Sequence, residues 1–301
     1  MYGICAARMR RSDLDYRLLL PLLVSGVLVQ AVVTIMRVTT SYRVVELDLP
    51  VIWLGIISST YAILPAFIAL RLGRFIDRGH DALATWIGAG LTVVACVGLL
   101  VSGADKPLLL GSTALLGIGN LFTIVSQQML CVRCSGLRSR ESVFGNFMVA
   151  CVIGQGLGPF IVGWVGGEAE VPPTQLLFAT GLALSAAALA VAAAIGPSRQ
   201  RGASHAGKEM PVAELLRLPG LWAVMVASVI TVTAGDLIVI YLPLLGAERA
   251  IDVNNIGALL TARALASAAA LPLPASPFRC RSGCFTRRRH RPVSPSASPI
   301  R

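Results

Sequence analysis

Charge is scarce in this sequence of 301 residues. Charged side chains make up 14% of it, against about 25% in a typical soluble domain, while hydrophobic residues make up 55%. A chain of this composition has more apolar surface than its own fold can cover, which excludes an ordinary soluble domain. The composition therefore predicts that a lipid bilayer covers the remainder.

Residues for acid–base catalysis are also few, since the chain has only three histidines. It lacks the Gly-x-Ser-x-Gly, phosphate-loop and His-Glu-x-x-His motifs of hydrolases, ATP-driven pumps and zinc proteases. Cys131 and Cys134 have the spacing of metal ligands, but no second pair lies near them. We expect no enzyme activity, no cofactor and no metal.

The excess of basic over acidic residues, 26 against 15, is uneven along the chain. Residues 271–301 contain seven arginines and no acid, which leaves the rest of the chain close to neutral. A nucleic-acid partner is therefore not expected.

Long uncharged apolar runs are frequent. A helix needs about 20 such residues to cross a hydrocarbon core of about 30 Å. Six runs satisfy this without a charge, a seventh contains one acid, and the eighth is interrupted by Arg263. Their length excludes barrel strands and predicts an all-α membrane protein. The expected spans are Leu18 to Met36, Val51 to Leu70, Ala82 to Gly103, Pro107 to Val132, Ser142 to Gly167, Val171 to Ser198, Leu218 to Gly246 and Asn255 to Leu273.

The connections between these spans alternate in charge. Fourteen Lys and Arg residues fall on the side of the N-terminus, and only four fall on the other side, together with seven acids. Cytoplasmic loops are enriched in Lys and Arg. We therefore expect a multi-pass protein of the cell inner membrane with a cytoplasmic N-terminus.

The longest polar connection follows the sixth span, and a basic segment rich in Pro and Ser ends the chain. An offset of about 202 residues between spans one and seven fits a plan of two repeated halves. Two interpretations of the last segment stay open: a disordered basic tail, or an out-of-frame translation that ends a longer protein early. The expected units are a complete six-helix half (1–196), a cytoplasmic linker (197–217), a partial second half with one or two helices (218–272) and the tail (273–301).

The connection after the second span contains Gly73, Asp77 and Arg78 in the order Gly-x3-Asp-Arg. This order resembles the loop signature of the major facilitator superfamily, at the position where that family carries it. Gly79 comes one residue early, and His80 and Asp81 replace the basic pair of the signature. The resemblance implies a loop that latches the two halves of the protein together on the cytoplasmic side.

A second pattern lies in the fifth span, where small residues recur at fixed spacing. It resembles the antiporter motif of the same family, Gly-x8-Gly-x3-Gly-Pro-x2-Gly-Gly, with Val162 as the departure. Glycines at such spacing allow close helix packing, and a proline bends the helix. The matching residues are Gly145, Gly154, Gly158, Pro159 and Gly163.

The resemblance implies a major-facilitator-like helix bundle and a secondary active transporter that works by alternating access, with efflux favoured. The fourth span lacks the Arg that many proton-driven relatives carry, so the coupling ion, a proton or another, stays open. Two alternatives also stay open: an uptake carrier of the same superfamily, and a truncated membrane protein that does not transport.

Ionisable and polar groups inside spans are the candidate site, because they are costly in the membrane unless they face water or a partner. Asp236 is the first of them, either as an ion or substrate site or paired with Arg263. Arg37, at the expected outer end of the first span, is a candidate for guiding an anionic substrate or for anchoring the helix at the interface. The complete set of candidates for the unknown small molecule and coupling ion is Asp236, Tyr241, Arg37, Asn120 and Gln155.

Overall fold

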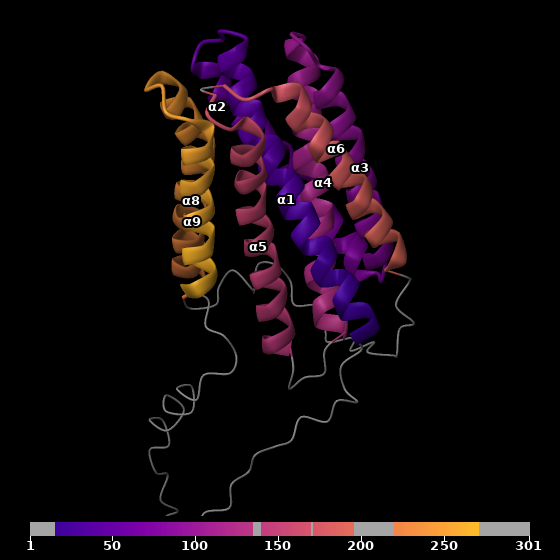
Figure 1. Cartoon of the computed structure of the whole chain (residues 1–301). Coiled ribbons are helices and arrows are strands. Elements are labelled where there is room, and N and C mark those ends of the chain that lie inside the picture. The colour runs from indigo at the N-terminus through magenta and orange to yellow at the C-terminus, as the bar shows by residue number, and fades with distance from the viewer. Residues whose placement is uncertain (1–15, 135–139, 170, 196–219, 271–301) are drawn as a thin grey trace, which may run out of the picture.

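A computed structural model describes residues 16–134, 140–169, 171–195 and 220–270 of the chain (Figure 1). The described residues form eight helices and contain no strand. Seven of the helices, α1 to α6 and α8, are long and apolar enough to cross a membrane. This confirms the expected all-α membrane fold. The helices are α1 (Tyr16–Glu46), α2 (Ile52–Asp77), α3 (Asp81–Val101), α4 (Lys106–Cys134), α5 (Arg140–Gly166), α6 (Thr174–Ala194), α8 (Leu221–Glu248) and α9 (Val253–Ala270).

The first helix is longer than the sequence indicated. It continues past the expected end at Met36 as far as Glu46 and therefore includes Arg37 and Arg43. The expectation was wrong because a charge does not end this helix: both arginines have partners on other segments. Arg43 is buried and donates hydrogen bonds to the carbonyl of Gly103 and to the hydroxyl of Thr174.

The eighth expected span is present as α9, but it is the one described helix that does not meet the length and hydropathy of a membrane span. The expected linker, residues 197–217, and the expected tail, residues 273–301, lie outside the described residues.

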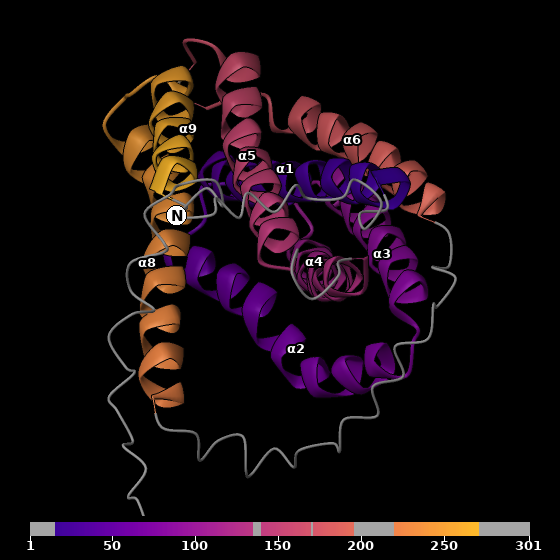
Figure 2. The same cartoon turned by 90° about the horizontal axis from the view of Figure 1, so that it is seen from below.

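The helices run alongside one another in a bundle, with α8 and α9 together at one edge (Figure 1). Viewed from below, α4 is seen end-on among α1, α2, α3 and α5 (Figure 2). The helix pairs with the most extensive contacts are α3 with α4, α5 with α9, and α1 with α5. Helix α1 is the most buried span and α8 the least buried, so α1 lies at the centre of the bundle and α8 packs at its margin.

Helix α5 packs closely against two neighbours, and its glycines make both contacts possible. On one face, a Cβ atom on Gly158 would lie 2.8 Å from Cβ of Thr34, and one on Gly154 would collide with the carbonyl oxygen of Val27. Both partners belong to α1. Contacts below 3.0 Å are not tolerated by real side chains, so α1 and α5 approach this closely only because both positions are glycine.

The other glycine face of α5 meets α9. A Cβ on Gly163 would lie 3.3 Å from Cα of Gly257, and a Cβ on Gly257 would lie 2.6 Å from the carbonyl oxygen of Pro159. Gly145, in contrast, has nothing within 4 Å of the Cβ position and takes part in neither interface. The expected single packing face is therefore two faces, and Gly145 belongs to neither. It lies nine residues, or two and a half turns, before Gly154, the first glycine of the α5 pattern that is in close contact.

Candidate functional site

A cavity of about 430 Å³ lies between the first six helices and the pair α8 and α9. Side chains from α1, α2, α4, α5, α8 and α9 line it. Four of the five candidates from the sequence lie together in this lining, namely Arg37, Asn120, Gln155 and Asp236. The other residues of the lining are Gln30, Val33, Thr34, Tyr61, Pro159, Thr231, Val232, Gly235, Val239, Leu260, Arg263, Ala264 and Ser267.

The fifth candidate, Tyr241, is not in the lining and is exposed to a fraction of 40%. It follows Asp236 by five residues, which on an α-helix places the two side chains about 140° apart. Tyr241 therefore points away when Asp236 faces the cavity.

Two residues of the cavity lining, Arg37 and Asp236, form an ion pair. Nη1 of Arg37 donates to Oδ1 of Asp236 at 2.8 Å, and so joins α1 to α8 across 199 positions of sequence. The Arg37 side chain is 14% exposed and that of Asp236 is 45% exposed, so the carboxylate is the more accessible partner. The sequence suggested Arg263 as a structural partner of Asp236, and this was wrong. The partner is Arg37, a residue that the sequence indicated as an anchor at the membrane interface or a guide for an anionic substrate.

Further polar contacts extend from the ion pair to α2 and α4. The Arg37 guanidinium lies over the ring of Tyr61 of α2, 4.7 Å from the ring centre. The Tyr61 hydroxyl accepts a hydrogen bond of 2.9 Å from Nδ2 of Asn120 on α4. Oδ1 of Asn120 is buried without a hydrogen-bond partner. Polar groups of four helices therefore converge here, and one amide oxygen remains free to accept.

Arg263 of α9 also lies at the cavity, although the sequence indicated it only as a possible partner of Asp236 and not as a site residue. It lines the cavity, and Nη2 of its guanidinium lies 2.5 Å from where a Cβ on Gly235 would be. The missing side chain of Gly235 thus leaves room for the guanidinium beside Asp236. Within the described ranges Arg263 has no ion-pair partner.

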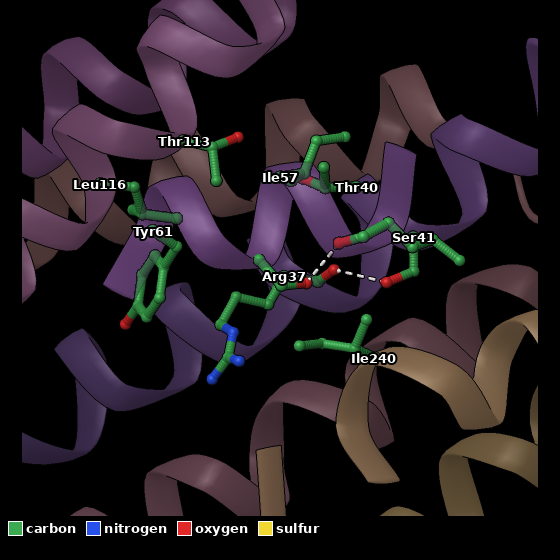
Figure 3. Close-up of a pocket in the computed structure, with 10 residues that line it drawn as sticks. Arg37, Thr40, Ser41, Ile57, Tyr61, Thr113, Leu116 and Ile240 are labelled. Atoms are coloured by element: carbon green, nitrogen blue, oxygen red, sulfur yellow. Dashed lines mark hydrogen bonds between the residues drawn. The ribbon is translucent and has the colours of Figure 1, made fainter. Parts of the chain in front are cut away.

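A much smaller cavity, of about 20 Å³, adjoins the same residues (Figure 3). Arg37 and Tyr61 line both cavities, and Thr40, Ser41 and Thr113 belong only to the small one. Figure 3 shows Arg37 beside Tyr61, with Ile240 of α8 on the other side of it. A space of this size holds about one water molecule.

The predicted latch residues lie far from the cavity, at the end of α2. Asp77 and Arg78 are exposed, and Gly73 has no atom within 4 Å of its Cβ position. The buried acid of this region is Asp81, whose Oδ2 lies 3.0 Å from Nη1 of Arg133 at the end of α4. The sequence treated Asp81 only as a departure from the signature, because its partner on α4 could not be recognised without the fold.

Arg133 also donates a hydrogen bond of 3.1 Å to the carbonyl of Ile76. The ends of α2, α3 and α4 are therefore tied together by one guanidinium. Asp81 lies in the first turn of α3, where a carboxylate is also stabilised by the helix dipole.

The described residues contain no cluster of three or more His, Cys, Asp or Glu that could hold a metal, and no curated protein matches the chain. The family model described as Major Facilitator Superfamily matches residues 18–287. This match covers most of the sequence and agrees with the seven apolar helices of the fold. The chain therefore belongs to the Major Facilitator Superfamily and is a multi-pass membrane transporter.

Proposed function

We propose that this chain moves a small molecule across the inner membrane by alternating access, with the cavity of about 430 Å³ as its binding site. The observation that carries the proposal is the position of the cavity, between α1, α2, α4 and α5 on one side and α8 and α9 on the other. In transporters built from repeated halves, the substrate site lies near the membrane midplane between the halves. Movement of α8 and α9 against the first six helices would open the site to each side in turn.

Four side chains are proposed to contact the transported molecule or the coupling ion: Arg37, Asn120, Gln155 and Asp236. All line the cavity. The half-exposed carboxylate of Asp236 is an accessible acceptor, and the amide oxygen of Asn120 is a buried acceptor without a hydrogen-bond partner. Valine and leucine side chains provide apolar surface in a wall where ten of the seventeen lining residues are polar or charged. Polar groups that converge on one cavity can fix the orientation of a small molecule.

Asp236 is the proposed coupling group, because it is the one carboxylate of the cavity lining. Protonation would release it from Arg37 and so break the link between α1 and α8. Export of the molecule in exchange for a proton is supported by the resemblance of the α5 glycine pattern to the antiporter motif. Gly154 and Gly158 of this pattern contact α1, and Gly163 contacts α9. Helix α5 thereby contacts both moving parts.

An uptake carrier is the second candidate, since the same cavity serves transport in either direction. Counterflow in vesicles of known orientation distinguishes the two. In this assay, unlabelled substrate is preloaded on the cytoplasmic side of the membrane, and labelled substrate is added on the other side. Accumulation of the labelled substrate in exchange for the preloaded substrate supports export.

Alternating access can be tested without a known substrate, by cysteine labelling on a background in which the seven native cysteines are replaced. Ala264 lines the cavity, whereas its neighbour Leu265 is exposed outside it. We expect Ala264→Cys to react with a membrane-impermeant thiol reagent applied to either side of the membrane. Leu265→Cys, the matched control, should react from neither side. Reaction of Ala264→Cys from one side only would contradict the proposal.

A further inference from the structure

We infer that the cavity takes an organic anion and that Arg263 of α9 binds its anionic group; this rests on the proposed function. The charged residues of the lining are Arg37, Asp236 and Arg263. Arg37 and Asp236 neutralise each other in a 2.8 Å ion pair. The cavity therefore carries one positive charge in excess, on Arg263.

Arg263 is the charged residue of the lining that no acidic side chain in the described residues neutralises. It forms no ion pair with any residue in the part of the chain that the structure describes. Charged residues within a membrane bundle are normally paired or face a water-filled space that serves a function. Its guanidinium lies beside Gly235, where the absence of a side chain leaves it room. A planar guanidinium in this position can bind a carboxylate through two parallel hydrogen bonds.

The same lining disfavours an organic cation. Asp236 supplies its one carboxylate, and Arg37 already occupies it. A cationic ligand would have to break that ion pair and would also be repelled by Arg263. An anion meets a free guanidinium and breaks no existing contact.

The remainder of the wall indicates the rest of the ligand. Val33, Val239 and Leu260 provide apolar surface, and Gln30 and Gln155 provide amide groups. The volume lies within the range of about 300 to 1,000 Å³ that holds drug-sized ligands. Hydroxyl groups of threonine, serine and tyrosine add further hydrogen-bonding groups to this wall. The expected ligand is thus a small molecule with a single carboxylate or sulfonate group and a body that has both apolar surface and hydrogen-bonding groups.

Three probes of equal size and different charge test this inference: 2-naphthoate, 2-naphthylmethanol and 2-naphthylmethylammonium. Their binding is measured by titration calorimetry on the full chain in nanodiscs of zwitterionic lipid, with empty nanodiscs as the blank. We expect naphthoate to bind at least about tenfold more tightly than the alcohol, and the ammonium compound to bind least. Equal affinities, or tighter binding of the ammonium compound, would overturn the inference.

Variants then locate the anion site. Arg263→Gln should weaken naphthoate binding by about tenfold or more and leave the affinity for the alcohol unchanged, whereas Arg263→Lys should keep part of it. Arg249→Gln removes the same charge outside the cavity, after the end of α8, and should change neither affinity. An unchanged naphthoate affinity in Arg263→Gln would reject the assignment.

A second variant guards against misfolding of the first. Gly235→Ala keeps every charge but places a methyl group against the Arg263 guanidinium, so it should also weaken naphthoate binding selectively. If naphthoate binding is lost in neither variant while Ala264→Cys still reacts from both sides, the anion inference fails and the transport proposal stands. If Ala264→Cys reacts from one side only, the transport proposal fails instead.

Discussion

Arg37 and Asp236 form the ion pair that links the central helix α1 to the most exposed span, α8. Each charge lies well inside its helix, where an isolated charge is costly. The pair therefore does two things: it stabilises two charges in the bundle, and it fixes the position of α8 against α1.

The first prediction concerns this pair. Either Arg37→Gln or Asp236→Asn leaves one charge without its partner, so each should lower the free energy of unfolding. We expect a loss of about 1 to 2 kcal/mol, below the value for fully buried pairs because Asp236 is half exposed. The double variant should be more stable than either single variant. Unfolding in mixed detergent micelles is the measurement.

Asp105→Asn is the matched control, because Asp105 is exposed in the connection between α3 and α4. It should unfold like the unchanged protein. Single variants that are as stable as the double variant would show that the ion pair contributes nothing to the bundle.

The second prediction concerns the contact between α1 and α5. Gly158→Ala places a methyl group 2.8 Å from Cβ of Thr34, so the helices must separate, at a cost of about 1 to 3 kcal/mol. Gly158→Leu should prevent the close approach altogether. Gly145→Ala, on the same helix but with open space around it, should change stability by less than about 1 kcal/mol. Equal thermal stability of Gly158→Ala and Gly145→Ala would contradict the close contact.

The third prediction separates two acids near the end of α2. The Asp81 side chain is only 3% exposed and is paired with Arg133. Asp81→Asn should therefore destabilise the protein by about 2 to 3 kcal/mol, since it leaves a partly buried guanidinium unpaired. Asp77→Asn should have almost no effect on stability, because Asp77 is exposed. Denaturant unfolding measures both.

Adding Arg133→Gln to Asp81→Asn should recover part of the loss, because no unpaired charge then remains. A larger loss in Asp77→Asn than in Asp81→Asn would show that the signature carboxylate, rather than Asp81, holds this end of the bundle.

The fourth prediction concerns orientation in the membrane. Lys and Arg are concentrated on the side that includes the connection between α2 and α3, which the positive-inside rule places in the cytoplasm. On a cysteine-free background, Ala104→Cys should react with an impermeant thiol reagent applied to intact cells. His80→Cys should react only after permeabilisation. The reverse pattern would invert the proposed topology.

Much of the fold can be predicted from the sequence, because a membrane span needs a long uncharged run and the chain has few charges to interrupt it. The limit of this reasoning is visible in α1. Its end was placed at Met36 because Arg37 follows, yet the helix continues to Glu46. The free-energy cost of burying the Arg37 charge can be predicted from the sequence. Its partner Asp236, which offsets that cost, lies 199 positions away in the sequence.

The candidate site shows the same limit. Asp236, Asn120 and Gln155 could be selected because polar groups are rare within spans, and all three reach the cavity. In the sequence, Arg263 interrupts a weak span and is a possible partner of Asp236, whereas Tyr241 is indicated by its nearness to Asp236. Which of them faces the cavity depends on helix rotation and on the packing of α9 against α5, and neither follows from apolar patterning.

The excess positive charge of the cavity has an electrical consequence. If a monoanion binds at Arg263, the loaded site is neutral and crosses the membrane without moving charge. In the proposed exchange the site returns without the anion and with the proton on Asp236, so it carries positive charge back, and each elementary charge that crosses the full field changes in energy by about 2.3 kcal/mol per 100 mV. A membrane potential that is negative inside would then favour the anion-free carrier that is open toward the cytoplasm. The return of the anion-free carrier, rather than the passage of the transported anion, would be the voltage-sensitive step of the cycle.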